Sequence, residues 1–241
     1  MNEYKRVIIC ARKVSRVFGT GEQRAVAVNE VDLDVGEGEF LAVVGRSGSG
    51  KTTLLNLLSG LDRPTSGNVT LEGRDLAQMS DDDLVGLRRH KMSFVFQSFA
   101  LLPLLSAYEN VELPLRIQGL PRGERRARIE QALERVGLTS RSHHRPYELS
   151  GGEQQRVGIA RAVVTAPQVI FADEPTGELD STNAHMIGDI LRSIAADGKV
   201  TVMVVTHDLT VAAMADRVVE LQDGVVVDGG VIAAQIRGRG E

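Results

Sequence analysis

A glycine-rich segment, GRSGSGKTT at residues 45–53, has the residue types and the spacing of a phosphate-binding loop. Its glycines allow a tight turn whose backbone N–H groups point inward, and a following helix adds partial positive charge at its N-terminus. Lys51 would supply a full positive charge to the outer phosphates of a nucleotide, and the Thr52 hydroxyl could ligate Mg²⁺. A plain turn would leave this lysine beside unpaired helix donors with no anion. The segment therefore predicts a site for a nucleotide with Mg²⁺.

Two adjacent carboxylates, Asp173 and Glu174, end the apolar run VIFAD. Ligands of open α/β sheets bind at such strand ends, where Asp173 could hold the metal and Glu174 could face an attacking water. An acidic cap between strand and loop is the alternative, and the phosphate loop makes catalysis the better interpretation. His207 ends the next apolar run and Gln97 follows MSFVF. Taken alone, each would be an ordinary capping, packing or polar residue.

A third segment, ELSGGEQQR at residues 148–156, combines a helix start with two residues that weaken it. Ser150 and Glu153 have the spacing of a capping box. Gly151 and Gly152 fill the first turn, although glycine costs about 1 kcal/mol relative to alanine inside a helix. A plain capped helix does not explain the paired glycines, so a backbone that must come close to a ligand is the better interpretation.

The elements that would position these residues change in character along the chain. Valine-rich patterns of strand type occupy residues 4–45, whereas helical patterns prevail from residue 80 to about 165. Single segments are predicted as strands at 67–73, 168–173, 200–208 and 217–222, and as helices at 51–60, 121–137 and 184–196. Asp223-Gly224 predicts a two-residue hairpin near the C-terminus. An α/β sheet interrupted by a helical insertion explains this order best.

Composition limits the class of protein. The 241 residues suffice for one large domain or a domain with a subdomain, and a net charge of −4 gives no general attraction for nucleic acid. No run approaches 18 apolar residues, so no membrane-spanning helix is predicted, and the N-terminus lacks the apolar stretch of a secretory signal. Cys10 is the single cysteine and is expected in a buried strand, which fits a reducing cytoplasm.

These segments together resemble the ATP-binding cassette (ABC) ATPases over roughly residues 4–230, and LSGGEQQR resembles the signature motif of that family. The resemblance implies an α/β fold: a P-loop NTPase (RecA-like) core with an N-terminal antiparallel β subdomain and an inserted α-helical subdomain. Residues 1–241 would form a single ABC ATPase domain. Residues 1–86 and 166–241 would be the nucleotide-binding core with the β subdomain, and residues 87–165 the helical subdomain with the signature motif.

The resemblance also implies a role for each candidate residue, with ATP and Mg²⁺ as ligands. Glu174 would be the catalytic carboxylate, His207 the switch histidine and Gln97 the lid glutamine that senses Mg²⁺ and the γ-phosphate. Lys51 joins this catalytic set, and the metal ligands would be Thr52, Gln97 and Asp173. The nucleotide would contact Phe18, Gly45, Ser47, Gly48, Ser49, Gly50, Lys51, Thr52, Thr53, Ser150, Gly151, Gly152 and Asp180. Phe18 would stack on adenine, with a core aromatic as the alternative.

Two copies of such a chain are expected to bind two ATP head to tail. In the family, the helix start at Gly151 and Gly152 is turned toward the ATP of the second subunit, where the helix dipole and the Ser150 hydroxyl stabilise charge. The loop GELD, at residues 177–180, resembles the segment that touches the partner subunit.

The runs FQSFALLP, DEPTGELD and HDLTVAAMADRVV resemble the subgroup that serves macrolide-efflux, lipoprotein-release and cell-division systems. Glu178 stands where that subgroup usually has asparagine. The resemblance implies a motor subunit on the cytoplasmic face of the inner membrane, coupled to a separate permease and not to nucleic acid. The permease is expected to dock on the apolar run after Gln97, part of which could instead be core, and near Tyr147.

Soluble ABC ATPases are the alternative class. Repair members carry a long coiled coil and translation members carry two cassettes, and neither feature is present. The iron–sulfur assembly type stays open as an alternative. A nucleotide-binding regulator without turnover is disfavoured because Glu174 and His207 are both present.

Overall fold

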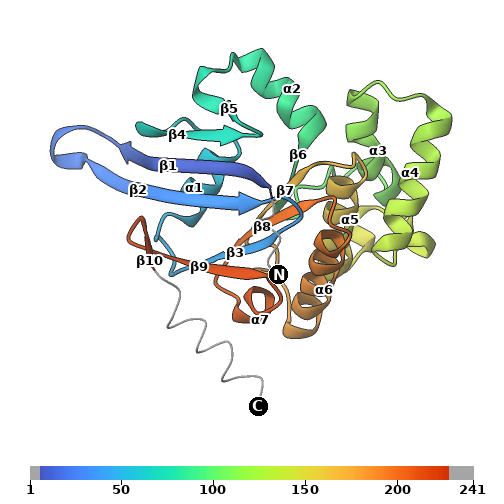
Figure 1. Cartoon of the computed structure of the whole chain (residues 1–241). Coiled ribbons are helices and arrows are strands. Elements are labelled where there is room, and N and C mark those ends of the chain that lie inside the picture. Colours follow the sequence, from blue (N-terminus) through green and yellow to red (C-terminus); the bar gives the residue numbers. More distant parts are fainter. Residues whose placement is uncertain (1–5, 228–241) are drawn as a thin grey trace.

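The computed structural model describes residues 6–227, so residues 1–5 and 228–241 of the predicted 1–241 domain lie outside the described residues. The described chain folds into two sheets and a group of helices (Figure 1). This arrangement confirms the predicted α/β fold with an N-terminal antiparallel sheet and inserted helices.

The first sheet is antiparallel and has four strands in the order β2-β1-β4-β5. Their bounds are β1 Val7–Phe18, β2 Ala25–Gly36, β4 Ser66–Leu71 and β5 Arg74–Asp75. The pairing of β1 is irregular around Lys13, whose φ is +47°. Such a bulge bends and twists the strand locally.

The second sheet has six strands in the order β10-β9-β3-β8-β7-β6. Their bounds are β3 Phe40–Val44, β6 Met92–Phe96, β7 Val169–Asp173, β8 Thr201–Thr206, β9 Arg217–Gln222 and β10 Val225–Val227. All neighbours pair in parallel except β10, which returns along β9. The return confirms the predicted Asp223-Gly224 hairpin, whose two turn residues have φ of +48° and +78°.

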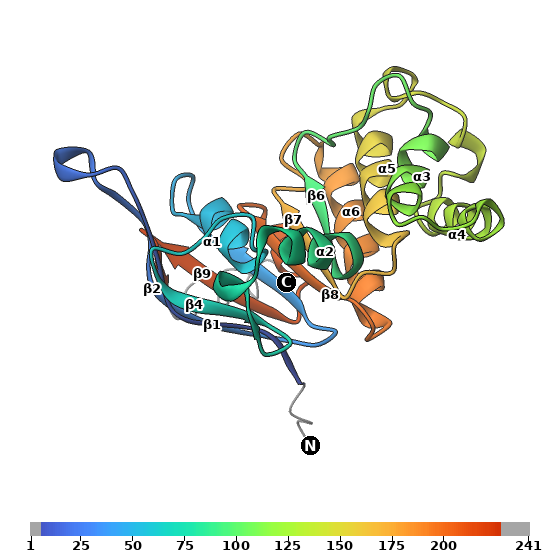
Figure 2. The ribbon, with the colours of Figure 1, turned by 90° about the horizontal axis from the view of Figure 1, so that it is seen from above.

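The helices cover both faces of the six-stranded sheet. The elements are α1 Lys51–Leu58, α2 Asp81–Lys91, α3 Ala107–Ile117, α4 Arg122–Arg135, α5 Gly151–Val163, α6 Ser181–Ala196 and α7 Leu209–Ala212. Helix α1 contacts strands of both sheets and so lies between them. Figure 2 shows α3, α4, α5 and α6 gathered at one end of the molecule and β1, β2 and β4 at the other.

Two hydrophobic cores follow from the alternation of side chains along the buried strands. In β3, the side chains of Phe40, Ala42 and Val44 belong to the core shared with α3 to α7. Leu41 and Val43 belong to the core shared with α1 and the antiparallel sheet. Strand β3, which leads into the glycine-rich loop, is therefore held from both faces.

One sequence expectation needs correction. Residues 92–96 fall in the segment where helical patterns were expected to prevail, yet they form β6 and pair with β7. The predicted helical segment 87–165 therefore includes one strand of the parallel sheet. MSFVF is short and apolar except for Ser93, so its periodicity alone does not separate a buried strand from a helix. Within residues 6–227, no helix has both the length and the apolar character needed to cross a membrane.

Candidate functional site

Four strand ends bring the predicted catalytic residues to one edge of the parallel sheet. Strand β3 runs into the glycine-rich loop, β6 into Gln97, β7 into Asp173 and Glu174, and β8 into His207. Because these strands are parallel, their carboxyl ends share an edge, which is where open α/β sheets bind ligands.

The glycine-rich loop turns sharply at Gly50, which precedes the first residue of α1 and has φ of +99°. A Cβ atom at this position would lie 2.1 Å from the carbonyl oxygen of Ala27, so only glycine fits. The next residue, Lys51, is 7% exposed, and its Nζ donates to the carbonyl oxygens of Gly45 at 2.9 Å and Arg46 at 3.1 Å. The loop therefore curls around a buried ammonium group.

Thr52 and Asp173 form the second part of the site. The Thr52 hydroxyl donates to Oδ1 of Asp173 at 3.1 Å. Burial raises the pKa of Asp173 from its ordinary value, and the bond from Thr52 opposes this rise. A hydroxyl and one carboxylate fit Mg²⁺, which usually takes one or two carboxylates and completes its shell with water and phosphate oxygens. No cluster of three or more His, Cys, Asp or Glu side chains suited to a metal occurs within the described residues, 6–227.

Glu174 is fixed at both oxygens of its carboxylate. Oε2 lies 2.9 Å from Nδ1 of His207 and accepts the backbone N–H of the same residue at 3.2 Å. Oε1 lies 3.5 Å from Nζ of Lys51. The backbone of Glu174 has φ of +46°, an uncommon conformation outside glycine, and its N–H donates to Val205 in β8. Strained backbone of this kind is concentrated at functional sites.

Except for Asp173, which is bonded to Thr52, these groups line one cavity of about 680 Å³. Its walls are Ala27, Arg46, Ser47, Gly48, Gly50, Lys51, Thr52, Thr53, Gln97, Glu174 and His207. Gln97 thus lines the same cavity as the phosphate loop, although it is distant along the chain. Ser49 is buried, and its hydroxyl has no partner among the described residues. Sequence reasoning missed Ala27 and Arg46 as wall residues, because neither has a motif-defining type.

Ser150, Gly151 and Gly152 do not line this cavity, and neither do Asp180 and Phe18. The structure therefore does not bring the predicted signature residues to the phosphate loop of their own chain. Phe18 ends β1 with 43% of its surface exposed, and the Arg16 guanidinium lies 4.6 Å from its ring centroid. It is thus not a core aromatic.

The start of α5 has the predicted capping box. The Glu153 N–H donates to the Ser150 hydroxyl at 3.3 Å, and the Ser150 N–H donates to the Glu153 carboxylate at 2.9 Å. The bond from the Ser150 N–H is the largest cause that lowers the pKa of Glu153 from its ordinary value. The helix start is therefore well formed despite its two glycines.

The two glycines of this helix start have different surroundings. A Cβ atom on Gly151 would make only ordinary contacts at 3.6 Å, with Leu179 and Phe99. A Cβ atom on Gly152 would lie 2.1 Å from Oδ1 of Asn183. Packing against Asn183 thus already favours glycine at residue 152. At residue 151, no contact within the chain favours glycine over a larger residue.

Asn183 also connects to Asp180, which caps α6. Asp180 Oδ1 accepts the backbone N–H of Asn183 at 2.8 Å, and Oδ2 accepts the side-chain amide at 2.9 Å. The backbone bond is the largest cause that lowers the pKa of Asp180 from its ordinary value. The start of α6 and the start of α5 are therefore joined through one asparagine.

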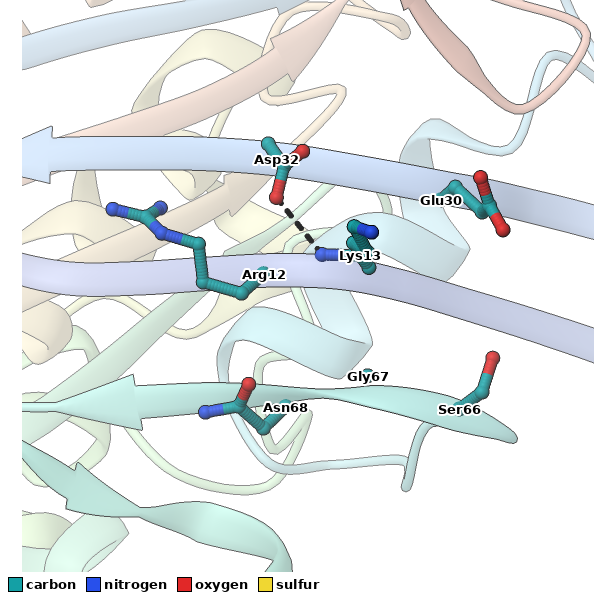
Figure 3. A pocket seen from close by; sticks show the side chains of 7 residues that line it. All are labelled: Arg12, Lys13, Glu30, Asp32, Ser66, Gly67 and Asn68. Atoms are coloured by element: carbon teal, nitrogen blue, oxygen red, sulfur yellow. Dashed lines mark hydrogen bonds between the residues drawn. The ribbon is translucent and has the colours of Figure 1, made fainter.

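A second hollow, of about 510 Å³, lies on the antiparallel sheet (Figure 3). Lys13 and Asp32 line it, and the Lys13 N–H donates to Asp32 at 2.9 Å. Arg12 beside it is paired with Asp34 at 2.7 Å. None of the predicted catalytic or nucleotide-binding residues lines this hollow.

Comparisons with known proteins agree on the kind of domain. A family profile described as "ABC transporter" matches residues 28–177. The chain is 50% identical over 222 residues to the "Macrolide export ATP-binding/permease protein MacB" of Rhodopseudomonas palustris strain BisB18, and 49% identical over 227 residues to MacB 1/2 of Paracoccus denitrificans. It covers 34% of the length of each, so it spans about a third of these relatives.

Solved structures give the same result. The chain matches the ATP-binding cassette MJ0796, which was solved as a dimer in a post-hydrolysis state bound to ADP and Pi. The TM-score is 0.83 and the sequence identity is 42%, and the match covers 91% of this chain and 97% of that chain. It also matches cbiO1 of Clostridium perfringens, part of an ABC transporter complex, with a TM-score of 0.87 and 26% identity over 98% of this chain and 94% of that chain.

Proposed function

Because this chain belongs to the ABC transporter family of ATPases, we propose that it is the motor of a membrane transporter or mechanotransmission complex. Two copies would sandwich two Mg·ATP head to tail and couple hydrolysis to a permease. The observation that carries the proposal is the separation of two sets of residues. Lys51 and Glu174 share one cavity, whereas Gly151 at the start of α5 does not line it.

ATP binding would depend on the phosphate loop. The inward-facing N–H groups at the N-terminus of α1 and the buried Lys51 ammonium provide a positive site for the outer phosphates. Thr52, Asp173 and Gln97 would hold the Mg²⁺ ion, which neutralises phosphate charge when it is bound. Arg46, which lines the same cavity, adds a further positive side chain.

Hydrolysis would depend on the orientation of Glu174. A water that attacks the terminal phosphorus would donate a hydrogen bond to this carboxylate while the bond between the terminal phosphorus and ADP breaks, which gives ADP and Pi. His207 and Lys51 hold the two carboxylate oxygens from different sides, so the group cannot turn freely. Positioning and charge stabilisation supply most of the catalysis in phosphoryl transfer. A carboxylate held in one orientation would position the attacking water.

The second copy would supply the start of α5. Its capped N-terminus presents helix N–H groups and the Ser150 hydroxyl, which suit a γ-phosphate. Gly151 has no internal reason to be glycine, and close approach of the partner's phosphate supplies one. The dimeric state of the MJ0796 cassette supports this arrangement. Asp180 and Glu178 would lie near the dimer axis.

The permease and the location in the cell are also proposals. The related MacB proteins join ATP-binding and permease in one name, which favours transport over the alternative of iron–sulfur cluster assembly. Leu104, in the apolar run after Gln97, is 80% exposed, and Tyr147, before the signature, is 72% exposed. These side chains would face the permease at the cytoplasmic side of the inner membrane. No partner of nucleic acid type is proposed.

One experiment tests the head-to-tail site. In a Glu174→Gln background, chains with Lys51→Ala and chains with Gly151→Asp are each expected to form no ATP-dependent dimer. Mixed together, they can build one intact site, from the loop of the Gly151→Asp chain and the helix start of the Lys51→Ala chain. We expect the mixture to trap labelled ATP in a larger species on gel filtration. Loss of ATP binding by the Gly151→Asp monomer would show that the helix start serves its own chain.

A further inference from the structure

Gln155 is a fully buried amide in α5 that contacts two of the strand ends at the cavity. It is 0% exposed, and its Nε2 donates to the carbonyl oxygens of Phe96 at 3.2 Å and Pro175 at 2.7 Å. Phe96 directly precedes Gln97, and Pro175 directly follows Glu174. One side chain therefore connects the backbone beside both residues.

Packing alone does not explain an amide at this position. The Oε1 atom of Gln155 is buried and has no hydrogen-bond partner among the described residues. An unpaired buried acceptor destabilises a fold, and an apolar side chain of equal length would avoid that cost. The amide differs from such an apolar side chain in the two hydrogen bonds that its Nε2 donates, and these bonds offset the cost of the unpaired oxygen.

Helix α5 also holds the backbone that follows Gln97. Phe99 and Ala100 have φ of +60° and +48°, an uncommon conformation for residues other than glycine. Arg161 of α5 donates to both, with Nη2 3.1 Å from the Phe99 oxygen and Nη1 2.5 Å from the Ala100 oxygen. The segment with Gln97 is thus bonded to α5 before and after the glutamine.

We propose that Gln155 is a positioning residue that fixes the strand ends bearing Gln97 and Glu174 to α5. The inference rests on the proposed function, in which the start of the same helix contacts the nucleotide of the second copy. Helix α5 then contacts the strand ends that act on a chain's own ATP and carries the helix start that acts on its partner's ATP. Both acceptors of the Gln155 amide lie outside the phosphate loop, so its loss would slow hydrolysis more than it weakens ATP binding.

The first measurement compares two amides of the full chain that each have a side-chain oxygen without a hydrogen-bond partner among the described residues. Gln155→Met keeps the length of the side chain and removes its donor. Gln168→Met is the matched control, because the Gln168 side chain donates to Glu72 at 2.9 Å and does not line the nucleotide cavity. We expect Gln155→Met to lower kcat about tenfold or more with KM within about twofold, since misplaced catalytic groups cost rate. Gln168→Met should stay within about twofold of wild type in both constants.

A double-mutant cycle separates positioning from general loss of stability. If Gln155 acts through Gln97 and Glu174, its effect on kcat is not additive with the effects of changing them. In at least one of the two backgrounds, Gln97→Ala and Glu174→Gln, Gln155→Met should lower kcat further by no more than about threefold. Unfolding temperatures of all variants are recorded, and kcat is measured well below the lowest of them.

Equal kcat for the Gln155 and Gln168 variants, or additive losses in both backgrounds, would overturn the inference. If Gln155→Met does not fold, Gln155→Asn takes its place under the same criteria, because its shorter amide cannot span both carbonyl oxygens. If Glu174→Gln loses turnover while Gln155→Met keeps it, the role of Gln155 is wrong and the proposed function stands. Turnover that survives Glu174→Gln would contradict the proposed function itself.

Discussion

Oε2 of Glu174 lies 2.9 Å from Nδ1 of His207, although 33 residues separate them along the chain. The contact joins the ends of β7 and β8, which are neighbours in the parallel sheet. It gives the carboxylate one orientation, because Lys51 lies 3.5 Å from the other oxygen. The two side chains that hold the Glu174 carboxylate therefore come from different elements, His207 from the end of β8 and Lys51 from the start of α1.

Glu174→Gln should keep Mg·ATP binding and lower turnover at least about 100-fold, the scale on which a general base contributes. An amide does not accept a proton from the attacking water as a carboxylate does. Calorimetry measures the dissociation constant for ATP, and phosphate release measures the turnover rate. Glu134→Gln, on the exposed face of α4, is the matched control. Turnover within a few-fold of wild type would place the catalytic role elsewhere.

Gly152→Ala should lower the free energy of unfolding by about 1–3 kcal/mol, because the added Cβ meets Asn183 in a packed contact. Gly151→Ala should leave it unchanged or raise it by up to about 1 kcal/mol, since alanine favours the helix. Urea unfolding of the single chain measures both. Gly152→Ala combined with Asn183→Ala should recover much of the loss. Equal effects at the two glycines would contradict the different roles of the two positions.

Stability should depend on pH through Glu153. The pKa of Glu153 is lower in the folded state than in the unfolded state. The ionised carboxylate therefore stabilises the fold at pH values above its unfolded-state pKa, and this stabilisation is lost as the pH falls through its folded-state pKa. At pH 7, Glu153→Gln should cost about 0.5–1 kcal/mol of unfolding free energy through the lost charge at the helix N-terminus. The difference from wild type should shrink below about pH 4. A difference that is constant between pH 7 and pH 3 would exclude this carboxylate as its source.

Tyr147→Cys, in a chain whose Cys10 is replaced by serine, should cross-link to a membrane protein and not to a second ATPase chain. Tyr147 is 72% exposed and leads into the start of α5. Cross-linking in membranes, followed by identification of the adduct, is the measurement. Val26→Cys on β2 is an exposed control that should give no such product. Adducts formed only between ATPase chains would refute the docking site.

The residues of the phosphate loop and the two carboxylates could be predicted from sequence because each follows an apolar strand with a defined motif. Strand β6 could not, because MSFVF is only five residues long and lies within helical patterns. The different reasons for Gly151 and Gly152 also stay hidden in the sequence. They depend on Asn183, which the fold brings against the second glycine from another helix. Gln155 is similar, because its two acceptors are backbone carbonyls, which have no sequence signature.

The Asp223-Gly224 turn that joins β9 to β10 has a consequence for protein engineering. A two-residue hairpin turn between strands is normally a favoured place for an inserted peptide or a fluorescent label. Here the Gly224 N–H donates to the Ser49 carbonyl at 3.0 Å, and the Gly224 carbonyl accepts the Asn29 N–H at 2.8 Å. These two bonds hold the turn against the phosphate loop and β2. Grafts at this tip would disturb nucleotide binding, whereas the turn at Gly119 between α3 and α4 does not line the nucleotide cavity, so an insertion after this glycine is the safer place for a tag.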